Sequence, residues 1–102
     1  MNLGLSEETL GKIQRTLERF PQVSRAVVYG SRAKGCYNPG SDIDIALEGE
    51  NLDLVVVAQL DEALDDLLLP YFFDITVLQQ VENPDLLEHI QRVGKTIFQR
   101  PT

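Results

Sequence analysis

Residues 41–45 read Ser41-Asp42-Ile43-Asp44-Ile45, which places two aspartates two positions apart in a run that alternates polar or small with apolar residues. This alternation predicts a half-buried strand over residues 42–47, in which both carboxylates project from one face and the isoleucines point into the core. Aspartate is depleted in strands, and two like charges on one face repel unless a cation lies between them. Magnesium takes hard oxygen ligands of this kind. The alternative interpretation is a solvent-facing strand edge that carries two acids.

A glycine-containing segment precedes this acidic pair. The sequence Gly30-Ser31-Arg32-Ala33-Lys34-Gly35 directly follows residues 23–29, whose β-branched and apolar side chains predict a strand. A glycine there allows a sharp turn and a close approach of the backbone to a ligand. The free N–H groups of a following helical turn, the Ser31 hydroxyl and the Arg32 and Lys34 cations all suit phosphate oxygens. A plain polar turn between two strands is the alternative, because short glycine motifs recur by chance.

A third acid lies in the run Phe72-Phe73-Asp74-Ile75-Thr76-Val77, which predicts a strand over residues 72–78. A carboxylate among apolar residues is costly to bury without a partner or a metal ion. If this strand shares a sheet with residues 42–47, Asp74 lies beside Asp42 and Asp44. An exposed position on a one-sided sheet, or a salt bridge, remains the alternative.

The remaining chain alternates helical and strand patterns, which favours an α/β or α+β domain. A helix is expected from the Ser6 cap to Pro21, another over Pro84–Val93 between the Asn83 cap and Gly94, and a short edge strand over residues 96–99. Residues 52–69 contain a strand-like valine run but follow helical spacing, so they predict a helix that ends before Pro70. Its expected core stripe is Leu52, Val55, Val56, Leu60, Ala63, Leu64, Leu67 and Leu68. The apolar residues Leu54, Val56, Val57 and Leu69 add more apolar surface than one core contact needs and indicate an interface.

Composition narrows the possible functions. The 102 residues predict a single domain over residues 1–102, and 16 acidic against 9 basic residues give a net charge of −7. This charge disfavours direct DNA binding, although bound divalent cations would offset part of it at a triphosphate site. Cys36 is the single cysteine, which excludes an internal disulfide. The N-terminus lacks a signal-peptide pattern and no apolar run is long enough to span a bilayer, so a cytoplasmic protein without a membrane segment is expected.

The order Gly30-Ser31, then Ser41-Asp42-Ile43-Asp44, then Asp74 resembles the DNA polymerase β-type nucleotidyltransferase superfamily, and within it the minimal nucleotidyltransferases (MNT) of prokaryotes. The resemblance spans residues 23–78. It implies a mixed β-sheet with helices packed on one face and an open active-site face. It also implies that Asp42, Asp44 and Asp74 are catalytic and bind Mg²⁺, with two ions expected, and that Gly30 and Ser31 contact the triphosphate. Arg32 and Ser41 complete the expected nucleotide-binding set.

The resemblance further implies the reaction. A nucleoside monophosphate, expected to be AMP from ATP, is transferred to a hydroxyl group by in-line displacement. Larger members of the superfamily carry another domain that grips the base and the acceptor, so a partner protein is expected to supply the acceptor here. The family implies a HEPN-domain toxin, with this chain as its antitoxin. Non-catalytic neutralisation of a HEPN protein and transfer to a small molecule are the alternatives. The intact carboxylate set favours the enzyme, and neither His89 nor Cys36 is assigned a catalytic role.

Overall fold

A mixed four-stranded sheet forms the centre of the molecule, which is a computed structural model that describes residues 3–101. The strand order is β3-β2-β1-β4. Strand β1 (Arg25–Tyr29) pairs antiparallel with β2 (Ile43–Glu48) and with β4 (Lys95–Gln99), whereas β2 pairs parallel with β3 (Phe73–Val77). The mixed sheet and the expected strands are thereby confirmed, and β3 and β4 form its two edges.

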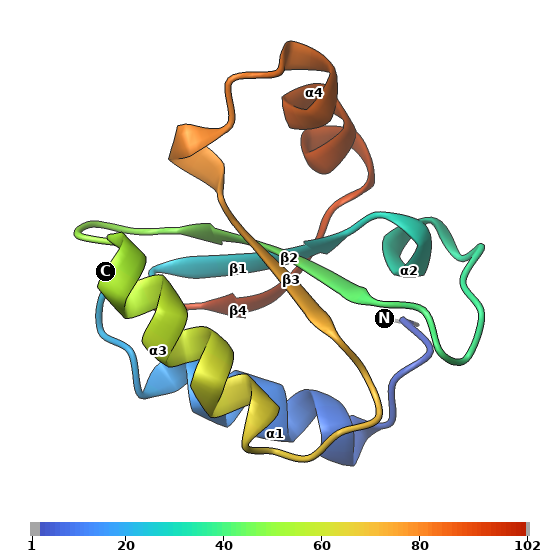
Figure 1. Ribbon diagram of the computed structural model, residues 1–102. Coiled ribbons are helices and arrows are strands. Elements are labelled where there is room, and N and C mark those ends of the chain that lie inside the picture. Colours follow the sequence, from blue (N-terminus) through green and yellow to red (C-terminus); the bar gives the residue numbers. More distant parts are fainter. Residues whose placement is uncertain (1–2, 102) are drawn as a thin grey trace.

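Helices cover the sheet on both faces (Figure 1). Helices α1 (Glu7–Glu18) and α3 (Leu54–Asp65) lie together on one face, as expected, and α4 (Pro84–Val93) lies on the other. The short helix α2 (Ser31–Lys34) follows β1, and a 3-10 turn, η1 (Leu78–Gln80), follows β3. The active-site face is therefore partly covered, since α4 packs on it. No helix within residues 3–101 combines the length and the apolar character that crossing a bilayer requires.

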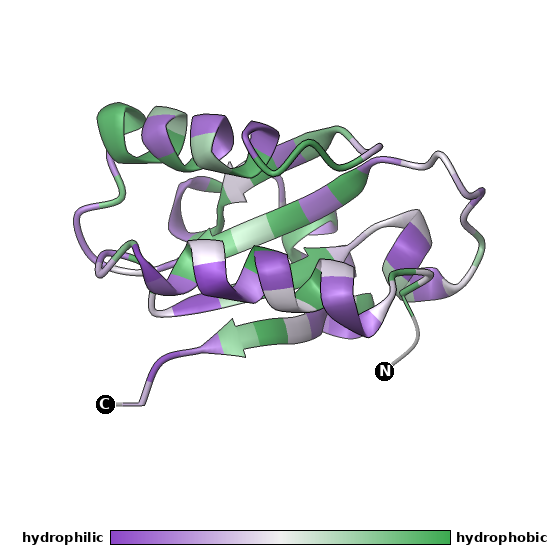
Figure 2. Ribbon diagram, turned by 90° about the horizontal axis from the view of Figure 1, so that it is seen from below, coloured by the Kyte–Doolittle hydropathy of each residue, from purple (hydrophilic) through white to green (hydrophobic). Residues whose placement is uncertain are grey.

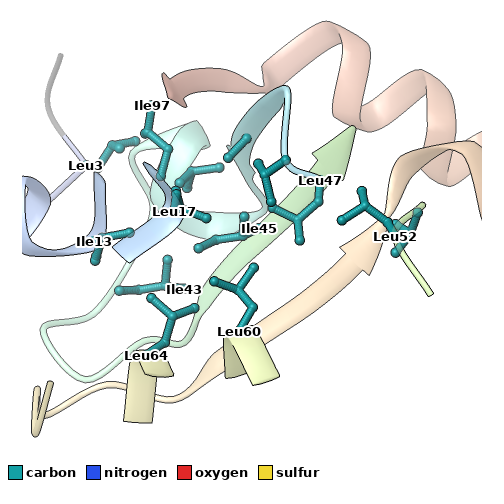
Figure 3. Close-up of a cluster of buried hydrophobic side chains, with 14 residues drawn as sticks. Leu3, Ile13, Leu17, Ile43, Ile45, Leu47, Leu52, Leu60, Leu64 and Ile97 are labelled. Carbon is teal, nitrogen blue, oxygen red and sulfur yellow. The ribbon is translucent and has the colours of Figure 1, made fainter. Parts of the chain in front are cut away.

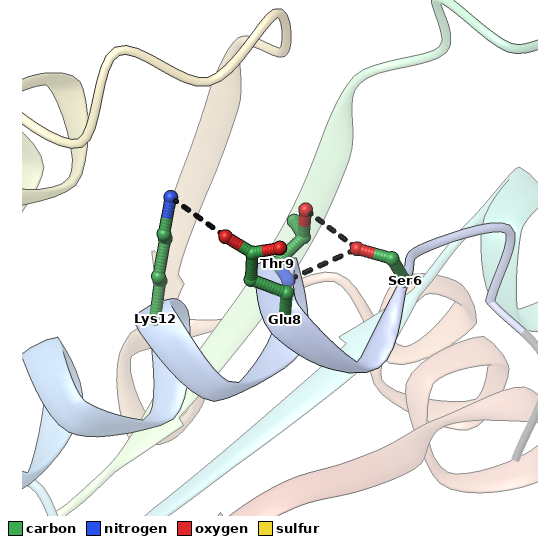
Figure 4. A network of polar contacts seen from close by, with 4 residues as sticks. All are labelled: Ser6, Glu8, Thr9 and Lys12. Atoms are coloured by element: carbon green, nitrogen blue, oxygen red, sulfur yellow. Dashed lines mark hydrogen bonds and ion pairs between the residues drawn. The ribbon is translucent and has the colours of Figure 1, made fainter.

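Local capping explains where the helices begin. The Ser6 hydroxyl accepts a hydrogen bond from the Thr9 amide at 3.1 Å, and Lys12 pairs with Glu8 at 3.6 Å one turn along (Figure 4). The Asn83 side chain accepts from the Asp85 amide at 2.9 Å at the start of α4. Such caps satisfy N–H groups that have no partner within the helix. Both predicted starts are confirmed, and α4 ends at Val93 before Gly94, also as predicted.

The main core lies between the sheet and the pair α1 and α3 (Figure 3). Its residues from the two central strands come from alternating positions, which are Ala26 and Val28 of β1 and Ile43, Ile45 and Leu47 of β2. The residues between them face α4 and form a smaller cluster, in which Val27, Tyr29 and Ala46 meet Ile90. Alternation in the strands thus divides the side chains between two layers, and Asp44 belongs to the α4 side.

Helix α3 is shorter than the sequence predicts. It ends at Asp65, and Leu68 follows with a left-handed φ of 56° and an exposed fraction of 90%. Val55 is 63% exposed, so it also leaves the predicted core stripe. Only Leu60 and Leu64 of the helix are fully buried, and Val55 lies well off their face because each residue rotates by about 100° around the axis. The surplus apolar residues are confirmed in part, since Leu54 is 89% exposed.

Candidate active site

Three strands bring a row of polar side chains together on the α4 side of the sheet. The register places Tyr29 of β1 opposite Asp44 of β2, and Asp44 opposite Asp74 of β3. Asp42 precedes β2 by one residue, and strand alternation sends its side chain to the same side as Asp44. The sheet therefore gathers the three predicted acids, which are 32 positions apart in sequence at most, onto one face.

The electrostatics of the acids show how closely they interact. Burial raises the pKa of Asp44, the charges of Asp74 and Asp42 raise it further, and His89 opposes them. Within residues 3–101, none of the three carboxylates forms an ion pair with a lysine or an arginine. Their mutual repulsion is therefore opposed by His89 but not by an ion pair with a lysine or an arginine, and a bound cation would relieve it.

The carboxylates are not, however, drawn into a closed ligand set. Among the described residues, no three Asp, Glu, His or Cys side chains lie close enough together to hold a metal ion. The donor chemistry suits Mg²⁺, which typically uses one or two carboxylates and takes its remaining ligands from substrate phosphates and water. Metal binding by Asp42, Asp44 and Asp74 therefore stays a prediction.

Gly30 fits tightly beside Asp44. It follows β1 with φ 74° and ψ −150°, a backbone conformation open in practice only to glycine. A Cβ atom at this position would lie 2.3 Å from Oδ2 of Asp44, well inside van der Waals contact. Ser31, the first residue of α2, comes next and is half-buried. The backbone turn at Gly30 thus borders the acidic row directly.

Arg32 has a different position from the one predicted. Its side chain is fully buried, and its guanidinium donates hydrogen bonds to the carbonyl oxygens of Leu3 (2.9 Å), Pro39 (3.2 Å) and Ser41 (2.9 Å). It also lies over the ring of Tyr71, 4.7 Å from its centroid. A buried guanidinium whose nitrogens all donate to main-chain carbonyls is not placed to contact a triphosphate. The predicted role of Arg32 in nucleotide binding does not fit this geometry, because main-chain carbonyl groups already accept the hydrogen bonds that its guanidinium donates.

Ser41 belongs to the same loop. Its Oγ accepts a hydrogen bond from the Asn38 amide at 2.8 Å, and its own amide donates to the Asn38 carbonyl at 2.9 Å. Together with Arg32, this turn fixes the segment that leads from α2 to Asp42. The local geometry therefore assigns Ser41 to the support of the site, and its predicted contact with the nucleotide gains no support from its surroundings. The exposed cation of the glycine segment is Lys34.

The chain matches the family model "Polymerase beta, Nucleotidyltransferase" over residues 11–102. It belongs to the polymerase beta nucleotidyltransferase family. No curated relative matches this nucleotidyltransferase. Among solved structures, a toxin–antitoxin complex with AMP-PNP is 25% identical with a TM-score of 0.74, and the match covers 89% of this chain and 73% of that chain.

Other solved structures share the fold of this nucleotidyltransferase. A tri-AMPylated Shewanella oneidensis HEPN toxin in complex with MNT antitoxin is matched at 21% identity and a TM-score of 0.71, over 94% of this chain and 74% of that chain. The MntA-HepT toxin–antitoxin is matched at 22% identity and a TM-score of 0.69, over 93% and 74%. The resemblance stated from the motifs, and the nucleotidyltransferase fold that it implied, are confirmed.

Tyr29, Thr76 and His89 lie beside the acids of this nucleotidyltransferase, and the sequence did not single them out. The Tyr29 hydroxyl lies 3.1 Å from Oγ1 of Thr76, so the ring crosses β2 between the edge strand and β1. Burial raises the pKa of Tyr29, the Thr76 hydrogen bond lowers it, and Asp74 and Asp44 raise it. The His89 ring of α4 meets the Tyr29 ring edge-on, with centroids 6.2 Å apart. Strand alternation places Tyr29 on the same face as Val27, and this was the signal available in the sequence. That signal does not identify Tyr29 as part of the site, because its role depends on α4 covering this face.

Proposed function

We propose that this nucleotidyltransferase uses Mg²⁺ to transfer AMP from ATP to a hydroxyl group of a HEPN-domain toxin, and that it acts as the antitoxin. The observation that carries the proposal is the row of acids beside the Gly30 turn, none of which, within residues 3–101, pairs with a lysine or an arginine. Supporting it, one structural neighbour is a toxin–antitoxin with AMP-PNP, and another contains a tri-AMPylated HEPN toxin with its MNT antitoxin.

We propose different roles for the residues of the site. Gly30 carries no side chain, so a triphosphate can approach Asp44 closely, and we assign phosphate contacts to the hydroxyl and amide of Ser31, which follows Gly30 directly. Asp42, Asp44 and Asp74 would hold Mg²⁺, which when bound supplies positive charge against the phosphate oxygens. With Arg32 fixed in the loop, Gly30 and Ser31 keep the nucleotide-binding role that we propose.

Asp74 stands nearest to an approaching acceptor, because β3 is the edge strand and its carboxylate is exposed. We propose that Asp74 accepts the proton of the acceptor hydroxyl. The hydroxyl oxygen forms a bond to the α-phosphorus, the bond from that phosphorus to the bridging oxygen breaks, and pyrophosphate leaves. We assign Asp44, which is half-buried in β2, and Asp42, just before that strand, to the triphosphate.

The test is intact-mass measurement of both chains after incubation with ATP and Mg²⁺, with a HEPN-domain toxin as acceptor. The expected result is a gain of whole AMP units on the partner, abolished by Asp42→Asn and retained by Glu50→Gln. Glu50 is a suitable control because it is an exposed acid outside the site. A tight complex that never gains mass would refute transfer, and modification of small-molecule hydroxyls without a partner would refute the assigned acceptor.

A non-catalytic antitoxin is the second candidate, and one observation favours it. Within residues 3–101 the acids are not close enough together to hold a metal ion as they stand. The two candidates differ in cells that express the toxin. A binding antitoxin protects with Asp42→Asn as well as with the wild-type chain, whereas a catalytic antitoxin loses protection with this substitution.

A further inference from the structure

Strand β3 leaves one edge of the sheet open next to the acids. The Phe72 carbonyl accepts a hydrogen bond from the Ile43 amide at 2.9 Å, and Phe73 stands opposite Ile43 in the parallel register. In a parallel pair, alternate residues turn their main-chain groups toward the neighbour. The N–H and C=O groups of Phe73 and Ile75 therefore face the open edge, whereas those of Asp74 face β2. Within residues 3–101, no strand pairs with this edge.

Two hollows run along this edge and join. One, of about 440 Å³, lies between the start of α3 and the segment that leads into α4, and its lining includes Leu54, Val57, Ile75 and Leu86. The other, of about 320 Å³, continues past Phe73 to Asp74. Both are lined by Leu54, Val57 and Ile75, so they form one continuous groove, which we call the β3 groove. The β3 groove follows the strand edge and ends at a proposed catalytic acid.

The apolar wall of the β3 groove is open to solvent. Leu54 is 89% exposed, and the hydropathy colouring shows the first turn of α3 as strongly hydrophobic (Figure 2). Proteins usually protect an edge strand with lysine, proline, a bulge or a covering segment. Strand β3, with the sequence FDITV, contains neither lysine nor proline, and its pairing with β2 is regular. Asp74 is the one charged side chain of this edge, and a weakly protected edge beside an apolar wall is an arrangement on which an extended peptide adds as a further strand.

The charge around the β3 groove selects the occupant. Asp53, Asp61 and Glu82 line it, and its lining residues include no lysine, arginine or histidine. Among the described residues, none of these three acids takes part in an ion pair. A cationic segment therefore complements the groove. A second copy of this chain would bring the same acidic rim and a net charge of −7, so it is disfavoured.

We propose that the β3 groove binds an extended segment of the acceptor protein, which adds as a strand to β3. Apolar side chains of that segment lie against Leu54 and Val57, and its lysine or arginine side chains lie near Asp53, Asp61 and Glu82. The inference rests on the proposed function, because the bound segment delivers a hydroxyl group to Asp74. The β3 groove is thus the surface that recognises the acceptor protein, which the triphosphate site does not recognise.

Two matched pairs of variants test the proposal. Leu54→Ser removes the apolar wall, and Leu68→Ser is its control, because these leucines are 89% and 90% exposed but only Leu54 lines the groove. Asp61→Lys reverses a rim charge, and Asp65→Lys does the same one turn along α3, outside the groove. By calorimetry with a HEPN-domain toxin that binds the wild-type chain, each groove variant should raise Kd about tenfold, and the controls should match the wild-type chain. Equal affinities across each pair would overturn the proposal.

Amide hydrogen exchange reads out the strand itself. Binding should slow exchange at the Ile75 amide, which faces the open edge, and should leave the Asp74 amide, already directed toward β2, nearly unchanged. Unchanged exchange at Ile75 in the complex would overturn strand addition. In transfer assays the groove variants should raise KM for the protein acceptor about tenfold and leave kcat and KM for ATP unchanged.

A peptide probe separates failure of this inference from failure of the proposed function. A peptide of alternating valine and lysine should slow exchange at Ile75, and its alternately N-methylated form should not, because it lacks the donors that an edge requires. If no AMP is transferred but the peptide and the variants behave as expected, binding by the β3 groove is supported and the proposed transfer of AMP is refuted. If AMP is transferred and the peptide leaves Ile75 unaffected, strand addition falls. Self-association that Leu54→Ser abolishes would assign the groove to a second copy and overturn the proposal.

Discussion

Gly30→Ala is the substitution that separates the function of the site from the stability of the fold. The backbone at Gly30 has φ 74° and ψ −150°, and holding a side chain in this region costs about 1–3 kcal/mol. The new Cβ would also lie 2.3 Å from Oδ2 of Asp44. Because carbon and oxygen do not pack closer than roughly 3.4 Å, the carboxylate must retreat by about 1 Å. A carboxylate at the end of a side chain can rotate away, so the contact shifts the Asp44 carboxylate more than it destabilises the protein.

Gly35→Ala is the matched control. Gly35 ends α2 with φ 81° and ψ 9°, and an added Cβ meets nothing within 4 Å. Its cost is the strain of a left-handed residue alone, about 1–2 kcal/mol. Both variants should therefore lower Tm, by roughly 5–15 °C for a domain of this size. Transfer should fall about 100-fold in Gly30→Ala, because a displacement of about 1 Å at a reacting centre has that effect, and should stay near the wild-type rate in Gly35→Ala.

The assay combines thermal unfolding with single-turnover transfer at a temperature where both variants are folded. The rise in Tm on adding Mg²⁺ and ATP gives a readout that does not depend on turnover, and it should disappear in Gly30→Ala and persist in Gly35→Ala. Equal transfer in the two variants would refute the reasoning, because it would mean that the position of the Asp44 carboxylate does not matter. In a double-mutant cycle, Asp44→Ala should remove the part of the Gly30→Ala cost that comes from contact and leave the backbone strain.

Three further predictions concern the same loop and row. Because burial, Asp74 and Asp42 raise the pKa of Asp44, the folded state binds a proton there more tightly than the unfolded state, and this stability is lost as the pH rises from below the ordinary value of 3.8 through the raised pKa. Asp44→Asn should therefore be more stable than the metal-free wild-type chain in urea at pH 7, with a difference that shrinks toward pH 3.5, and it should lose Mg²⁺-dependent ATP binding in calorimetry; a less stable variant would contradict this. Arg32→Lys should lower the free energy of unfolding by at least about 2 kcal/mol, since one ammonium group cannot serve the carbonyls that the guanidinium holds, and a loss near zero in urea unfolding would be inconsistent with its buried role. Ser31→Ala should leave Tm unchanged and reduce transfer severalfold, because one neutral hydrogen bond contributes about 0.5–1.5 kcal/mol, and a wild-type rate would leave Ser31 as a turn residue only.

Features that depend on neighbouring residues were predictable from the sequence. The starts of α1 and α4 follow from the Ser6 and Asn83 caps, and the end of α4 follows from Gly94, because each signal acts within one helical turn. The common face of Asp42 and Asp44 follows from strand alternation in the same way. The register that sets Asp74 beside Asp44 was expected only if the two strands were neighbours, which a local pattern does not determine.

Features that depend on distant residues were not predictable in this way. The burial of Arg32 requires carbonyl groups at positions 3, 39 and 41, so the motif around it suggested a phosphate contact instead. Helix α4 packs on a side of the sheet that is set by the path of the chain after β3. The contact between His89 and Tyr29 depends on the same path. The early end of α3 depends on the turn at Leu68. No proline or glycine lies between Asp65 and Leu69 to signal this turn in the sequence.

The bond from Arg32 to the Leu3 carbonyl has a practical consequence for handling the protein. It fastens the beginning of the described chain to the loop that carries Asp42, and the two lie close together beside α2 (Figure 1). A fusion tag or a deletion at that end is therefore expected to disturb the loop that carries Asp42, although the two are far apart in sequence. The other end leaves the sheet from β4, away from α2, so affinity tags and fluorophores belong there. A fluorophore near Leu3, by contrast, would report directly whether the loop is fastened or released.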